Sequence, residues 1–193
     1  MYIPPYFKIE DADEITRFIE SNGFGQLVTQ VEGQLFATHL PFLYDRDAQT
    51  LTAHIAHSNP QWQNIEEQQV LVILSGPHGY ISPSWYTSPG VPTWNYQAVH
   101  ITGVAKCTTD PGALANIVTA LTAQYESHME SPWVPTYQTQ KLLGIVGIEI
   151  AISNIQCKYK LSQNRSPQDQ ENVATKLHSA GNRELAQAMQ KLR

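Results

Sequence analysis

The residues best suited to chemistry gather in one short stretch, residues 52–62, which reads Thr-Ala-His-Ile-Ala-His-Ser-Asn-Pro-Gln-Trp. A predicted strand ends here and a predicted short helix, 60–68, begins, with Ser58 and Asn59 as candidate N-caps. Free N–H groups and the dipole at a helix start favour an anion. The stretch is therefore either a phosphate cradle, to which His57 adds charge, or a well-capped surface helix.

The same stretch raises the question of a metal site. His54 and His57 are three residues apart on a predicted strand, so their side chains are expected to point to opposite faces. No cysteine or acid stands at ligand spacing beside them, and no metal is predicted. Cys107 and Cys157 fall in predicted strands and are expected to be unreactive free thiols.

A second polar cluster reads Lys158-Tyr-Lys-Leu-Ser-Gln-Asn-Arg165, between a predicted strand and a capped helix. Its cations and amides suit a bound anion or the polar edge of a heterocycle, with Lys160, Gln163 and Asn164 as the candidate contacts. The alternative is a solvated loop with a basic helix entry. The chain contains no Gly-x-Ser-x-Gly elbow, no P-loop and no Gly-x-Gly-x-x-Gly.

The composition limits the classes of protein. Charged residues make up only 15% and the net charge is −5, whereas phosphate-driven DNA binding needs a concentrated basic face. No apolar run approaches the roughly 20 residues that span a bilayer, and the first residues do not have the pattern of a signal peptide. We expect a cytoplasmic protein with no membrane segment and a single core.

Alternating and apolar runs predict strands, and caps predict the helices between and after them. The predicted strands are 26–31, 34–43, 50–55, 70–74, 98–108, 143–152 and 155–161. Glu32-Gly33 predicts a hairpin turn between the first two. The predicted helices are 11–23, 60–68, 110–127, one that begins at 166–167 and 183–192. Asp110 and Ser166, each followed by a proline, are the predicted N-caps of the third and fourth. The stretch 76–96 combines Pro and Gly with five Trp and Tyr residues, which predicts a long ordered loop packed against the strands.

The short links between strands in 26–55 leave no room for the crossover helices that parallel strands require. The predicted fold class is therefore α+β, a small and mainly antiparallel barrel of six to seven strands with peripheral and C-terminal helices. Residues 1–165 are expected to form the barrel domain, and residues 166–193 a helical extension packed on the same domain.

Several longer blocks of sequence resemble one known family. They are Leu40-Pro-Phe-Leu43, Ala56-His-Ser-Asn-Pro-Gln-Trp62, Gly76-Pro-His-Gly-Tyr-Ile-Ser-Pro-Ser-Trp-Tyr86, Val91-Pro-Thr-Trp-Asn-Tyr96 and Lys160-Leu-Ser-Gln-Asn-Arg165. In this order they resemble the PaiB-type FMN-binding proteins, often labelled negative transcriptional regulators. The resemblance covers nearly the whole chain.

The resemblance implies a split β-barrel of the pyridoxamine-phosphate-oxidase type, a homodimer with FMN at the subunit interface. It makes residues 1–165 the FMN-binding domain and favours the phosphate cradle over a plain capped helix. One departure stands out, because many relatives carry Arg where this chain has His57. A weaker and pH-dependent phosphate grip follows from that exchange.

The resemblance also assigns residues to the cofactor. Lining of the isoalloxazine is expected from Thr38, His39 and Leu40, and a wall of the cofactor or the dimer seam from Trp94. The phosphate end is expected at His54, Ala56, His57, Ser58, Asn59 and Trp62. Lys160, Gln163 and Asn164 are expected to reach ribityl or phosphate oxygens.

Three functions stay open at this point. The first is an FMN-binding negative regulator of transcription, for which direct DNA contact is not supported by the charge. The second is an FMN-dependent oxidoreductase acting on a small planar substrate, in which the flavin carries hydride or electrons. The third is a split barrel that binds haem.

Overall fold

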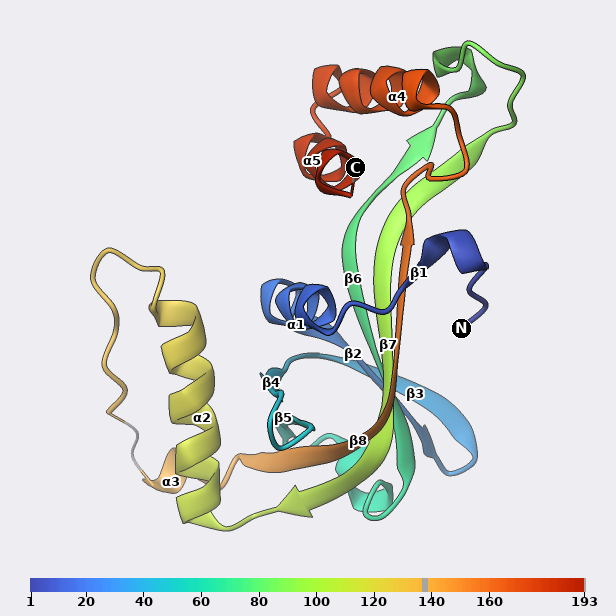
Figure 1. Cartoon of the computed structure of the whole chain (residues 1–193). Helices are drawn as coiled ribbons and strands as arrows, with labels where there is room; N and C mark the ends of the chain where they lie inside the picture. Colours follow the sequence, from blue (N-terminus) through green and yellow to red (C-terminus); the bar gives the residue numbers. More distant parts are fainter. Residues whose placement is uncertain (137–138, 193) are drawn as a thin grey trace. The chain divides into compact units, whose positions relative to one another are not determined.

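The structure is a computed structural model that describes residues 1–136 and 139–192 (Figure 1). Its contacts divide the chain into two compact units, which are described separately. The first unit combines Met1–Ile15, Ser75–Val99 and Gln156–Arg193. The second unit combines Thr16–Leu74 and His100–Ile155. Both units are therefore built from segments that are distant in sequence.

The strands form an eight-stranded sheet in the order β3-β2-β6-β7-β8-β5-β4, and β1 pairs with β8. Their bounds are β1 Lys8–Ile9, β2 Phe24–Val31, β3 Gln34–Pro41, β4 Leu43–Asp45, β5 Thr50–Ala56, β6 Gln69–Ile81, β7 Thr93–Thr108 and β8 Ile145–Lys160. The order has two ends, β3 and β4, so the sheet is open and not a closed barrel. An antiparallel α+β fold is confirmed, with eight strands instead of six to seven.

Helices connect and follow these strands. Three are 3-10 helices, namely η1 Pro5–Phe7, η2 Pro60–Asn64 and η3 Pro83–Trp85. The α-helices are α1 Ala12–Ser21, α2 Pro111–Glu126, α3 Thr139–Leu142, α4 Pro167–Ser179 and α5 Arg183–Lys191. The predicted caps are confirmed, since Asp110 accepts the N–H of Ala113 (2.8 Å) and Ser166 accepts the N–H of Asp169 (3.1 Å).

In the second unit, β2 and β3 form the predicted hairpin. Glu32 and Gly33 have φ angles of +50° and +77°, the left-handed pair that a tight turn between twisted strands requires. Helix α2 covers β8 closely, because a Cβ on Gly147 would lie 2.6 Å from the Ile117 Cδ1 atom. The α2 side of this core holds Leu114, Val118 and Leu142.

In the first unit, α4 and α5 pack together near the end of β6 (Figure 1). Asp169 on α4 is fully buried and accepts the hydroxyl of Ser88 (2.6 Å), the N–H of Thr87 (2.7 Å) and its hydroxyl (2.8 Å). These hydrogen bonds, that of Ser88 foremost, hold the pKa of Asp169 well below its usual range. The carboxylate thus ties the segment between η3 and β7 to α4.

Three predicted elements differ from the structure. The ordered loop predicted at 76–96 is wrong over much of its length, because β6 continues to Ile81 and β7 already begins at Thr93. The helix predicted at 60–68 is the short 3-10 helix η2. The two strands predicted in 143–161 are the single strand β8.

The structure has eight strands because it adds two short ones, β1 and β4, and merges two predicted strands into β8. Strand β1 has two residues and β4 has three, which is less than an alternating pattern needs to be recognised. His57 also lies outside β5, which ends at Ala56, so the expected opposite-face arrangement with His54 on one strand does not occur.

Candidate functional site

A buried amide network underlies the predicted phosphate stretch in the second unit. Gln61 of η2 is fully buried, and its Nε2 donates to the Leu27 carbonyl (3.1 Å) and the Thr29 hydroxyl (2.9 Å). Its Oε1 accepts the hydroxyl of Thr38 (2.6 Å). The Thr38 oxygen in turn accepts from the Asn59 amide (3.0 Å), and Asn59 also accepts the Gln61 N–H (2.9 Å). Thr38, predicted to line the flavin ring, and Asn59, predicted at the phosphate end, are therefore in direct contact.

The turn above this network presents free polar groups. His57 and Ser58 are exposed, and neither the imidazole of the first nor the hydroxyl of the second bonds to any described residue. Two hydrogen bonds hold the backbone of the turn. The N–H of His57 donates to the Gly144 carbonyl (2.8 Å), and the Trp62 indole donates to the His57 carbonyl (2.8 Å). The His57 and Trp62 rings lie 5.1 Å apart. Ala56, also exposed, precedes the turn.

His54 contributes a polar atom without a partner. It lies half-buried on β5, opposite Gly147 of β8, and its Nδ1 is buried with no hydrogen-bond partner among the described residues. Burial lowers the pKa of His54, which favours the neutral imidazole at pH 7. A buried polar atom left unpaired costs about 1–3 kcal/mol, and such atoms are usually completed by a ligand or water.

The three residues predicted to line the flavin ring do not share a face. In the β2–β3 register, Leu27 is opposite Thr38 and Gln26 is opposite His39. Thr38 and Leu40 therefore face the η2 network, whereas His39 points to the other face of the hairpin, where its ring stacks on Phe24 at 6.2 Å. The side chains of these three residues therefore do not line one common surface of the strand.

The remaining predicted residues lie in the first unit. The Lys160 ammonium donates to the Thr93 hydroxyl and to the Trp94 carbonyl (2.7 Å). Gln163 has both ends of its amide engaged, since it accepts the Leu161 N–H (2.6 Å) and donates to the Tyr159 carbonyl (2.5 Å).

Two of these predicted residues stay open to solvent. Asn164 is exposed and its amide makes no hydrogen bond with a described residue. Trp94 is 54% exposed, with the rings of His78 and Tyr80 at 6.4 and 6.2 Å. Its flat face suits a planar ligand.

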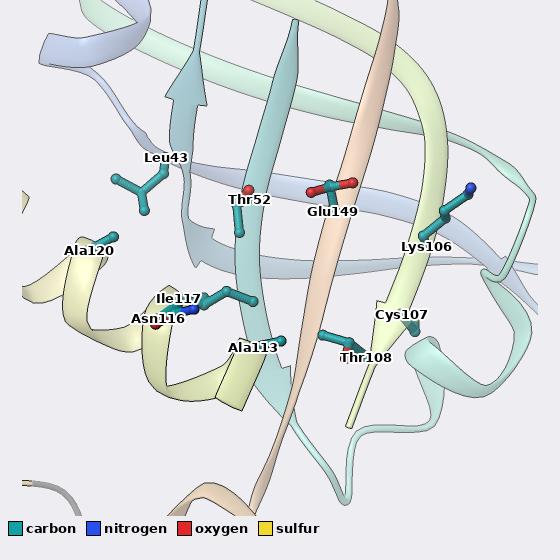
Figure 2. Close-up of a pocket in the computed structure, with 10 residues that line it drawn as sticks. All are labelled: Leu43, Thr52, Lys106, Cys107, Thr108, Ala113, Asn116, Ile117, Ala120 and Glu149. Carbon is teal, nitrogen blue, oxygen red and sulfur yellow. The ribbon is translucent and has the colours of Figure 1, made fainter. Parts of the chain in front are cut away.

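A cavity of about 470 Å³ lies in the second unit (Figure 2). The sequence-based predictions did not include it. Its volume falls within the range of small-molecule pockets. Figure 2 shows lining residues from α2 on one side and from strands on the other. The lining residues are Leu43, Thr52, Lys106, Cys107, Thr108, Ala113, Asn116, Ile117, Ala120 and Glu149. Thr52 and His54 are two residues apart on β5, so their side chains lie on the same face of the strand. This spacing is the pattern in the sequence that could have associated Thr52 with the predicted site.

Both thiols are poorly suited to nucleophilic chemistry. Burial, with the Glu66 carboxylate as a second cause, raises the pKa of Cys107 to about 11. Burial raises the pKa of Cys157 to about 12. Nucleophilic cysteines have a lowered pKa, so neither thiol is a candidate. Within the described ranges no helix is long and apolar enough to cross a bilayer, and no group of three metal-ligating side chains occurs there.

The family of the chain follows from comparison with known proteins. Residues 1–154 match the model of the family described as "Putative FMN-binding domain", and the chain belongs to this FMN-binding family. The sequence-based prediction of FMN as cofactor is thereby confirmed. The chain is 42% identical to the "Protease synthase and sporulation protein PAI 2" of Bacillus subtilis, over 98% of this chain and 97% of that protein. The predicted PaiB-type resemblance is confirmed as well.

Solved structures show the same fold at low identity. An FAD and haem binding protein from Mycobacterium smegmatis superposes with a TM-score of 0.66 at 13% identity, covering 87% of this chain and 79% of that one. The flavocytochrome Anf3 from Azotobacter vinelandii gives a TM-score of 0.65 at 15% identity, covering 82% and 72%. At these identities the likeness concerns the fold, and the predicted split-barrel architecture is confirmed.

Proposed function

We propose that this protein is a flavin-dependent negative regulator of gene expression in the cytoplasm. The observation that carries the proposal is the 42% identity, over almost the full length of both chains, to a protein named for protease synthase and sporulation. The acidic net charge of −5 argues against wide DNA contact by this chain itself. Regulation would then pass through a ligand or a partner protein.

We place the FMN phosphate at the turn of His57 and Ser58, whose polar side chains make no hydrogen bonds within the described chain. The unpartnered Nδ1 of His54 offers one more hydrogen-bonding atom to a ligand. Thr38 and Asn59 support the turn through their hydrogen bonds in the Gln61 network. Trp94, Lys160 and Asn164 remain proposed contacts of FMN. Gln163 instead stabilises its own turn, since its amide bonds to Leu161 and Tyr159. When bound, FMN supplies hydride or electron transfer.

The purified protein is expected to show a flavin spectrum and to release FMN, identified by mass, on heating. His57→Arg should tighten FMN binding roughly tenfold, because a guanidinium holds phosphate with two charge-assisted hydrogen bonds. Quenching of flavin fluorescence measures this affinity. His128→Arg, at another exposed histidine of the same unit, is the control.

Each alternative gives a different spectrum in the same experiment. A Soret band would identify a haem protein, and rapid bleaching of bound flavin by NADH or NADPH would identify an oxidoreductase. A colourless protein that takes up no added FMN would refute the flavin function. Equal FMN affinity in His57→Arg and the unmodified protein would place the phosphate elsewhere.

We further propose that the protein is a homodimer, with FMN at the subunit interface, and that the β2–β3 hairpin forms part of that interface. Strand β3 is an end of the sheet, and Leu35 and Phe24 on one face of the hairpin are 79% and 61% exposed. Apolar side chains on an open edge strand favour pairing with another chain.

Leu35→Glu is expected to raise the dimer dissociation constant at least roughly tenfold, because it places a charge inside an apolar interface. Analytical ultracentrifugation across a concentration series measures the change. Val134→Glu replaces a similarly exposed apolar residue outside the sheet and serves as control. An unmodified protein that is monomeric at all concentrations would exclude the dimer.

A further inference from the structure

A small polar pocket lies in the first unit, where β8 ends and β7 begins. Its volume is about 130 Å³, and we call it the Lys160–Arg165 pocket. The lining residues are Tyr86, Val91, Thr93, Asn95, Lys160, Ser162, Asn164 and Arg165. Pockets for whole small molecules begin near 300 Å³. This pocket therefore has room for one chemical group and not for a flavin ring.

The turn that carries the pocket is held in an unusual conformation. Ser162 is buried and has a φ of +68°, a left-handed conformation that residues other than glycine rarely adopt. The Asn95 amide donates to the Ser162 hydroxyl (2.9 Å), and the N–H of Arg165 donates to the Ser162 carbonyl (2.9 Å). Such strained residues cluster at ligand sites, where the surrounding structure keeps them in place. Here the turn brings Arg165 back beside Lys160.

The two cations of the pocket have donors to spare. Lys160 uses two of its three N–H groups, on Thr93 and the Trp94 carbonyl. Arg165 donates to the Pro89 carbonyl (3.2 Å), and its guanidinium lies 4.3 Å from the centre of the Tyr86 ring. Arg165 therefore keeps several of its five N–H groups.

No counter-ion balances this charge inside the described part of the chain. Neither Lys160 nor Arg165 has a carboxylate oxygen within 4.0 Å. Asp169 belongs to the same unit, but its oxygens hold Thr87 and Ser88. Burial, then the nearby charges of Lys158 and Arg165, lowers the pKa of Lys160. A negative group in the pocket would relieve that repulsion.

We propose that the Lys160–Arg165 pocket binds one phosphate-like oxyanion, held by Lys160 and by the fork of Arg165. The exposed amide of Asn164 adds a donor at the rim. The charge of a phosphate monoester, between −1.5 and −2 near pH 7, matches the two cations. Because the proposed function places the FMN phosphate at the His57 turn, the group is either a separate phosphorylated ligand or the FMN phosphate lying here instead of at that turn. Both sources share this chemistry.

Inorganic phosphate tests the pocket on the full-length, flavin-free protein. At constant ionic strength, phosphate is expected to raise the thermal unfolding midpoint and to give saturable heat in calorimetry, whereas chloride should do neither. Arg165→Gln should weaken phosphate binding about tenfold to a hundredfold. Asn164→Asp disturbs only an exposed side chain, and its added negative charge should also weaken binding. Lys176→Gln, an exposed cation of the same unit, should leave it unchanged.

Riboflavin, which lacks the phosphate, separates the two sources. If the pocket holds the flavin phosphate, Arg165→Gln lowers the affinity for FMN but not for riboflavin, and phosphate competes with FMN. If a second ligand is held, FMN-loaded protein binds phosphate as before. The proposal is overturned if phosphate behaves as chloride does, or if Arg165→Gln and Asn164→Asp bind it as the unmodified protein does. A protein that takes up no added FMN would refute the flavin function and leave this phosphate test valid.

Discussion

Gln61→Leu is expected to lower the free energy of unfolding by about 3 kcal/mol. The leucine fills a similar volume but removes every side-chain hydrogen bond of the buried amide. Thr29, which is 5% exposed, then loses its donor, and Thr38 loses its acceptor. Each buried polar group left unpaired costs about 1–3 kcal/mol, a large share of the 5–15 kcal/mol that stabilises a typical protein. Urea denaturation followed by circular dichroism measures the loss.

Gln63→Leu is the matched control, because Gln63 lies in the same 3-10 helix but is exposed. Exposed substitutions of this kind change stability by no more than about 0.5 kcal/mol. A Gln61→Leu protein as stable as Gln63→Leu would show that the amide network contributes nothing. Loss of stability with unchanged FMN affinity would separate the network from the proposed phosphate turn above it.

Asp169→Asn is expected to lower the thermal unfolding midpoint by several degrees, and the difference should depend on pH. The folded-state pKa of Asp169 lies below its unfolded value. The folded protein therefore binds fewer protons at this residue, and its stabilising effect is fully present above an ordinary Asp pKa of about 3.9. It disappears as the pH falls from about 4 toward the lower folded pKa. The two proteins should differ by a constant amount from pH 5 to 8 and converge below pH 4.

Differential scanning calorimetry at pH 3, 4, 5 and 7 makes this comparison. Asp47→Asn changes an exposed carboxylate between β4 and β5 and should show no such convergence. A difference that stays constant down to pH 3 would mean that the carboxylate charge is not what Thr87 and Ser88 recognise. The measurement also bears on the Lys160–Arg165 pocket, since the segment tied to Asp169 supplies its Tyr86 wall.

The fold was largely readable from local signals in the sequence. Capping residues Asp110 and Ser166 mark the starts of α2 and α4, and Glu32-Gly33 marks the hairpin turn, because each has a local physical effect. The end of β6 was missed because it runs through Gly76-Pro-His-Gly79, residues that normally interrupt strands. Tertiary pairing overrides those local preferences there.

The candidate site was readable only as a set of residue types. The sequence shows that Gln163 and Asn59 carry amides, but not that the chain itself uses these groups. An amide that closes its own turn and one that is free for a ligand look identical in sequence. Arg165 is not among the predicted contacts, because its place beside Lys160 depends on the left-handed conformation of Ser162. The sequence does not reveal that conformation.

The pairing of β1 with β8 has a consequence for how the protein is made. Lys8 of β1 is aligned with Lys158 of β8, 150 residues further along the chain. At a synthesis rate of about 5–20 residues per second, roughly eight to thirty seconds separate the emergence of the two strands from the ribosome. Strand β1 must wait that long without its partner, so its pairing with β8 is a late event in folding during synthesis.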